Sequence, residues 1–236
     1  MICLSSRPLV GLFSWLALTG LPAAPVQAGT LPAQVRIVYD VLYGSAQLRV
    51  GRAEQRWKVE GGRYELQTQL VPLVGPDVRY VSRGTLGAGG LVPDSFAEYR
   101  GSGGTPRVQA EFDWNRKQLR YGKGGERKEA ALEAGAQDVN ALPYQLAWLG
   151  EVAPGRLQVT TGKKVAHYQF AAAAPVKVSV DGKEISARPL RSVESDGDRT
   201  EVWLAPQLGH LPVRVIRMDE DKELRFIARE VQQGGR

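Results

Sequence analysis

The chain has 236 residues, 43% of them hydrophobic and 24% charged, with 31 Lys and Arg against 25 Asp and Glu and a net charge of +6. Because basic and acidic residues alternate along most segments and form no basic block with aromatic residues, the charge does not indicate a nucleic-acid partner. The only cysteine, Cys3, excludes an internal disulfide and a metal site of several thiolates, and only two histidines remain as imidazole ligands.

Residues 1–28 have the pattern of a secretory signal peptide. Arg7 precedes an apolar run from Leu9 to Leu21, and small residues lead to a cleavage site that we place after Ala28. The run is shorter than the ~20 residues of a membrane-spanning helix, which makes a retained membrane anchor the weaker alternative. We therefore expect an exported protein that works outside the cytoplasm, in which 29–236 form one β-rich domain, without stable membrane insertion after cleavage.

The next segments alternate apolar and polar residues, which is the period of half-buried strands. In the first segment one face carries four apolar residues: Val35, Ile37, Tyr39 and Val41. Gly61-Gly62 predicts a tight hairpin turn before a return strand over Arg63–Leu73, because glycine accepts the positive φ that such turns need. Glycine turns at 87–90 and 101–104 separate further strands, up to the alternating segment Val108–Trp114. This spacing favours a meandering sheet or a barrel.

One segment, 138–149, has the period of a helix. Its apolar residues recur at spacings of three and four, and Gly150 ends the run. Asp138 is a candidate N-cap, but Pro143 suits the first turn of a helix, which leaves a start near Asn140 or Leu142 open. The segment is apolar almost all round, so we expect a buried helix that plugs a curved sheet.

Beyond the helix the strand pattern resumes. Asp181-Gly182 and Asp196-Gly197 are dipeptides of hairpin turns. The predicted strands are Arg156–Thr161, Lys164–Ala171, Val176–Val180, Ile185–Glu194, Thr200–Ala205, Pro212–Met218 and Glu223–Val231. The expected fold class is mainly β: a curved antiparallel sheet or incomplete β-barrel with one short apolar helix, about 138–149, against its concave side.

Templates for catalysis find little support in the sequence. Gly101-Ser102-Gly103 lacks the spacing of a nucleophile elbow and lies between strands, and Gly162-Lys163-Lys164 lacks the full phosphate-loop motif. His167 falls on the polar face of its strand and His210 in a turn. Glu194 and Glu201 can be a pair of carboxylates across a hairpin, but charges that alternate along a strand are usually its solvated face. We expect no catalytic residue, no metal and no cofactor.

Several motifs, in this order, resemble the exported bacterial proteins of the domain-of-unknown-function family DUF3108. They are Tyr39-Asp40-Val41, Ser82-Arg83-Gly84-Thr85-Leu86, Phe112-Asp113-Trp114, Gly135-Ala136-Gln137-Asp138, Tyr144-Gln145-Leu146 and the run from Glu201 to Val215. The resemblance implies a periplasmic β-rich protein without an established activity. Its expected fold is similar to that of periplasmic lipoprotein carriers such as LolA and LolB, in which a curved sheet surrounds a helical lid and an apolar cavity.

The function we expect is non-enzymatic binding of an apolar or amphipathic envelope component, a lipid or a lipoprotein acyl chain. A curved sheet can hold an apolar ligand in its mouth. The candidate ligand-binding residues come from the helix and one later strand: Trp148, Leu146, Leu142, Tyr144 and Trp203. The alternatives are a structural or interaction module of the envelope and a hydrolase that acts on envelope polymers. The sequence leaves the oligomeric state open.

Overall fold

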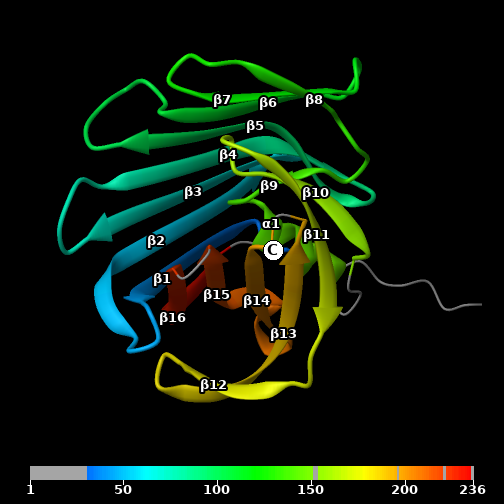
Figure 1. Ribbon diagram of the computed structural model, residues 1–236. Helices are drawn as coiled ribbons and strands as arrows, with labels where there is room; N and C mark the ends of the chain where they lie inside the picture. The colour runs from blue at the N-terminus through cyan, green and yellow to red at the C-terminus, as the bar shows by residue number, and fades with distance from the viewer. Residues whose placement is uncertain (1–30, 151–153, 196, 220–221, 235–236) are drawn as a thin grey trace, which may run out of the picture.

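The computed structural model describes residues 31–150, 154–195, 197–219 and 222–234 (Figure 1). The predicted signal peptide, residues 1–28, lies outside the described residues, as does Asp196 of one predicted turn. The elements are β1 (Gln34–Tyr43), β2 (Leu48–Glu60), β3 (Arg63–Pro72), β4 (Val78–Gly87), β5 (Gly90–Arg100), β6 (Val108–Asp113), β7 (Gln118–Lys123), β8 (Lys128–Ala131), β9 (Gln137–Asp138), α1 (Leu142–Leu149), β10 (Arg156–Thr160), β11 (Val165–Ala172), β12 (Val176–Val180), β13 (Lys183–Glu194), β14 (Arg199–Ala205), the 3₁₀ turn η1 (Pro206–Leu208), β15 (Leu211–Asp219) and β16 (Lys222–Gly234).

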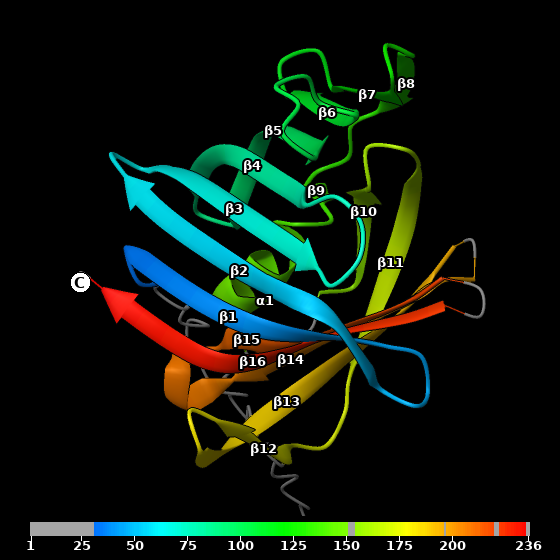
Figure 2. The same ribbon diagram turned by 90° about the vertical axis from the view of Figure 1, so that its left-hand side faces the viewer.

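The strands form one 16-stranded sheet that curls around α1 (Figures 1 and 2). Its order is β8-β7-β6-β5-β4-β3-β2-β1-β16-β15-β14-β13-β11-β10-β9, with β12 on β13. All pairs are antiparallel except β9 with β10. The two halves of the chain meet where β1 pairs with β16. The predicted curved, incomplete barrel with a short helix is confirmed.

The sheet does not close between its edge strands β8 and β9. Residues 132–136 connect these two strands, and we call this gap the seam. Side-chain amides bridge it: Gln158 Nε2 donates to Ala131 O at 2.8 Å, and Gln158 Oε1 accepts from Glu133 N at 3.1 Å. Gln137 of β9 also donates from Nε2 to Leu91 O of β5 at 2.9 Å. Hydrogen bonds of individual side-chain amides therefore take the place of a ladder of backbone hydrogen bonds at the seam.

Alternation along the strands decides which side chains enter the core. The four residues of the first predicted face lie buried in β1: Val35, Ile37, Tyr39 and Val41. Gly61 and Gly62 form the predicted turn with φ of +56° and +74°, and Glu60 pairs with Arg63 across it. Because both residues have positive φ, a side chain there would be strained.

The helix α1 begins four residues later than Asp138. Pro143 lies in its first turn and Gly150 ends it, as the sequence indicated. Asp138 instead ends β9, and its Oδ1 accepts hydrogen bonds from the backbone N–H groups of Asn140 and Ala141, each at 2.9 Å. This Asx-type turn leads the chain from the sheet edge into the helix. The helix packs against β5, β14 and β15.

None of the helices in the described ranges has the length and apolar character to cross a bilayer.

Candidate functional site

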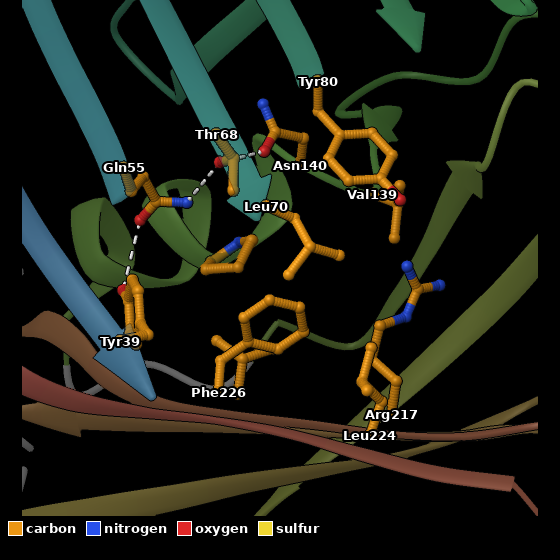
Figure 3. Close-up of a pocket in the computed structure, with 12 residues that line it drawn as sticks. Tyr39, Gln55, Thr68, Leu70, Tyr80, Val139, Asn140, Arg217, Leu224 and Phe226 are labelled. Carbon is orange, nitrogen blue, oxygen red and sulfur yellow. Dashed lines mark hydrogen bonds between the residues drawn. The ribbon is translucent and has the colours of Figure 1, made fainter. Parts of the chain in front are cut away.

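A cavity of about 110 Å³ lies inside the curve of the sheet (Figure 3). Its walls come from β1–β4 on one side, β15 and β16 on the other, and the chain that leads into α1. Eight apolar or aromatic residues line it: Tyr39, Leu70, Tyr80, Val139, Pro143, Val215, Leu224 and Phe226. Four polar residues complete the lining: Gln55, Thr68, Asn140 and Arg217. Among the described residues, the lining includes no carboxylate and so no pair of acids of the kind that a glycosidase needs.

The floor of the cavity joins the first and the last strand. Tyr39 of β1 and Phe226 of β16 meet edge to face, with ring centroids 6.2 Å apart and planes at 88°. This arrangement places the positive edge of one ring on the negative face of the other. The Tyr39 hydroxyl lies 2.8 Å from Pro212 O and 3.2 Å from Gln55 Oε1 and donates to one of them at a time. Burial raises the pKa of Tyr39 far above its usual value, so the hydroxyl stays protonated.

A chain of hydrogen bonds crosses one wall of the cavity (Figure 3). Gln55 donates from Nε2 to Thr68 Oγ1 at 3.0 Å, and Thr68 donates to Asn140 Oδ1 at 2.7 Å. Asn140 donates from Nδ2 to Ser82 Oγ at 3.0 Å and to Leu66 O at 3.2 Å. These amide and hydroxyl groups satisfy one another, so the wall is polar in composition but offers few free donors.

The chain ends behind the cavity at a buried carboxyl group. Ser82 donates from Oγ to Asp138 Oδ1 at 2.7 Å. Burial raises the pKa of Asp138 to about 6, against the opposing effect of the hydrogen bonds from Ser82 and from the Ala141 and Asn140 N–H groups. The other oxygen, Oδ2, has no hydrogen-bond partner among the residues that the structure describes.

Of the described residues that line the cavity, Arg217 is the charged one. Within the described ranges its side chain forms no hydrogen bond and no ion pair. Burial raises the pKa of neighbouring Tyr80, and Glu98 raises it further, while Arg217, Arg100 and Arg107 act in the opposite direction. Glu98 is itself paired with Arg107 at 3.3 Å. The Tyr80 end of the cavity therefore carries an excess of positive charge.

A second hollow, of about 600 Å³, lies over β1–β3, and its lining includes four charged residues: Arg36, Arg52, Glu54 and Arg56. Arg36 contacts Glu54 at 2.7 Å and Glu230 at 3.2 Å, so its charge is already neutralised. Partly exposed pairs of this kind contribute little and leave little for a ligand. We therefore place the candidate site in the inner cavity.

The five predicted ligand-binding residues lie around the helix but do not line this cavity. Leu142 and Leu146 are buried in the core with Leu190 and Leu204. Tyr144 stacks on Trp57, with ring centroids 4.8 Å apart. Trp148 and Trp203 are half-buried against the core. Arg214 lies over the Trp203 ring at 4.1 Å, and Trp203 Nε1 donates to Glu201 Oε2. Their role in binding stays a prediction.

Sequence reasoning missed the residues that do line the cavity, although a signal for Arg217 was present. In β15 and β16, Val215 pairs with Phe226 and Arg217 with Leu224. A period of two puts these four side chains on one face, so Arg217 takes a position that is otherwise apolar. A lone arginine on an apolar strand face is the pattern that could have identified this site.

The residues weighed for catalysis are held in structural contacts. Glu194 is buried and accepts from Thr200 Oγ1 at 2.7 Å, whereas Glu201 pairs with Arg191 at 3.1 Å. His167 Nε2 lies 2.8 Å from Glu133. Among the described residues, no group of three or more His, Cys, Asp or Glu is arranged to hold a metal ion.

Comparison with known proteins supports the fold and gives the family. The crystal structure of a beta-barrel-like protein of domain of unknown function DUF1849 from Brucella abortus is similar, with a TM-score of 0.56 and 12% sequence identity. The similarity covers 87% of this chain and 99% of that chain, which at this identity speaks for the fold alone. No curated protein matches the chain. A family model described as protein of unknown function (DUF3108) matches residues 38–222, and the chain therefore belongs to this family.

Proposed function

We propose that this protein is a non-enzymatic periplasmic binder of an apolar or amphipathic component of the cell envelope, such as a lipid or a lipoprotein acyl chain. The observation that carries the proposal is the apolar cavity between β1–β4, β15–β16 and the start of α1. Ligand sites are concave and mostly apolar, with a few polar groups that fix orientation, and this lining has that composition. The proposal keeps five further residues around the helix as ligand-binding residues: Trp148, Leu146, Leu142, Tyr144 and Trp203.

The size of the cavity limits what enters it. An engineered protein cavity of roughly 150 Å³ admits benzene, and this one measures about 110 Å³. It therefore holds one end of a chain, while the remainder of a longer ligand extends out of it. Single-chain amphiphiles of medium length are the appropriate first probes.

A larger side chain on one wall of the cavity tests the proposal. Leu70 lines it from β3, whereas the next residue, Val71, points to the other face and is 48% exposed. We expect Leu70→Trp to lower the affinity for a medium-chain fatty acid at least tenfold, because the indole occupies the space of the chain. Val71→Trp adds the same side chain outside the cavity and should bind as the wild type does. Titration calorimetry with octanoate gives both affinities.

Native mass spectrometry of protein purified from the periplasm gives an independent test. The proposal predicts a bound lipid that is depleted in Leu70→Trp and retained in Val71→Trp. A wild-type protein that carries no lipid, and takes up none after delipidation, contradicts it.

A further inference from the structure

We propose that the cavity selects anionic amphiphiles, with Arg217 pairing with the anionic head group and the apolar part lying among Leu224, Phe226 and Leu70. This inference rests on the proposed function and names the ligand class of the same site. Figure 3 shows the Arg217 side chain rising from β15 beside Val139 and toward Tyr80.

The guanidinium group of Arg217 belongs to a side chain on an otherwise apolar strand face. Arg217 shares its face with Val215, Leu224 and Phe226, and in the described part of the chain its side chain has neither a hydrogen bond nor an ion pair. Arg217 is half-buried, and a ligand that covers the rest of its guanidinium costs free energy unless it supplies an opposite charge and hydrogen bonds. A bound carboxylate or phosphate supplies both, and arginine presents a planar fork that matches such groups.

The charges that act on Tyr80, at one end of the cavity, are mainly positive. Arg100 and Arg107 act on Tyr80 together with Arg217, and Glu98 is the acid that opposes them there. Glu98 also lies 4.0 Å from Lys163 in addition to its contact with Arg107. Since this carboxylate is shared by two other cations, it does not neutralise Arg217. The local field favours a negative head group over a neutral or cationic one.

The amide and hydroxyl groups of Gln55, Thr68 and Asn140 are already hydrogen-bonded within the wall of the cavity. Gln55, Thr68 and Asn140 donate to one another and to Leu66 O and Ser82. A head group placed there would have to break these bonds. Within the described residues, the donors of the lining that make no hydrogen bond are those of Arg217 and the hydroxyl of Tyr80, and Arg217 lies at the opposite side from Tyr39 (Figure 3). The ligand is therefore oriented with its head at Arg217 and Tyr80.

The experiment compares two probes of equal chain length, octanoate and octanol, by titration calorimetry. We expect the wild type to bind octanoate about tenfold or more tightly than octanol, which is the scale of a charge-assisted hydrogen bond. Arg217→Met should remove this preference and leave octanol binding unchanged, and Arg217→Lys should keep part of it. Octyl phosphate in a third titration distinguishes the source of the anion. A preference for octanoate assigns a fatty-acid head group and a preference for octyl phosphate a phospholipid-type one, and either supports the inference.

The matched control is Arg199→Met. Arg199 lies on β14 next to Thr200, the residue that pairs with Arg217; it is exposed and does not belong to the described lining of the cavity. Because both variants replace one arginine with methionine, they have the same net charge. It should bind both probes as the wild type does.

The outcomes separate the two proposals. If the wild type binds octanol as tightly as octanoate, or if Arg217→Met keeps the preference, the anionic selection is wrong and apolar binding stands. If no probe binds and Leu70→Trp has no effect, the proposed function itself fails. A thermal melt of each variant shows whether it is folded before binding is compared.

Discussion

Asp138 illustrates at the scale of one residue how burial creates a pH-sensitive contribution to stability. Its folded pKa of about 6 lies above the ordinary 3.8 because the carboxyl group is completely buried. The folded protein therefore binds more protons than the unfolded chain between these values. Stability from this group is present at low pH and is lost as pH rises through about 6, by up to about 3 kcal/mol in the free energy of unfolding.

The check is Asp138→Asn, which keeps an oxygen to accept from Ser82, Asn140 and Ala141 but carries no charge. We expect urea denaturation between pH 4 and pH 8 to show a downward trend in the wild type relative to the variant. The variant is needed as a reference because other carboxylates make the free energy of unfolding rise with pH. One of them is Glu54, whose pKa is lowered by its hydrogen bond to Arg36. Parallel pH profiles in the two proteins would show that the carboxyl group does not titrate in this range.

At the scale of elements, the hairpin turn between β10 and β11 packs against β5 and β6. Gly162 has φ of +75°, and a Cβ added there would lie 2.4 Å from Val108 Cγ1 of β6 and 3.2 Å from Phe96 Cε1 of β5. Gly182, in the turn between β12 and β13, has a similar φ of +70° but nothing within 4 Å of its position. A comparison of alanine substitutions at Gly162 and Gly182 therefore separates the cost of backbone strain from the cost of a packing clash.

Gly162→Ala should therefore destabilise the protein more than Gly182→Ala. Both variants carry the left-handed penalty of about 1–2 kcal/mol, and the first adds the cost of moving Val108 and Phe96. Equilibrium urea denaturation gives the two free energies of unfolding. Equal losses would mean that the turn is not packed against β5 and β6 as described.

The elements themselves were largely predictable, whereas the cavity was not. Strand alternation and the glycine turns depend on neighbours in sequence, and Gly61-Gly62 fixes one hairpin through backbone geometry alone. The start of α1 at Leu142 is one of the positions that the sequence leaves open; Asp138, the other candidate cap, is held in the sheet by the pairing of β9 with β10. The cavity lining joins Leu70 with Leu224, and no local pattern shows that β3 and β16 face each other.

At the scale of the whole molecule, the pairing of β1 with β16 brings the two ends of the described fold together, with Gln34 opposite Gly234. A short glycine-serine linker between residues 31 and 234 should therefore preserve the sheet. We expect a circular permutant that is reopened between Gly124 and Gly125, in an exposed turn with nothing within 4 Å of either glycine, to fold and bind octanoate.

The matched permutant is reopened between Gly162 and Lys163, in the turn that packs on Val108. It should have a lower urea midpoint than the first one, because freeing this turn loosens the contact between β10–β11 and β5–β6. Circular dichroism and urea denaturation compare the two. A first permutant that fails to fold while the second succeeds would contradict the topology.

The seam has a mechanical consequence for the cavity. Widening the barrel elsewhere would break a continuous ladder of backbone hydrogen bonds, whereas the seam is held by the side-chain amides of Gln158 and Gln137. The strand at its edge, β9, runs directly into Val139, Asn140 and Pro143, which line the cavity. A displacement of this edge is thus transmitted to the cavity wall through adjacent peptide bonds. The place where the barrel resists expansion least is also the place that sets the volume available to a ligand.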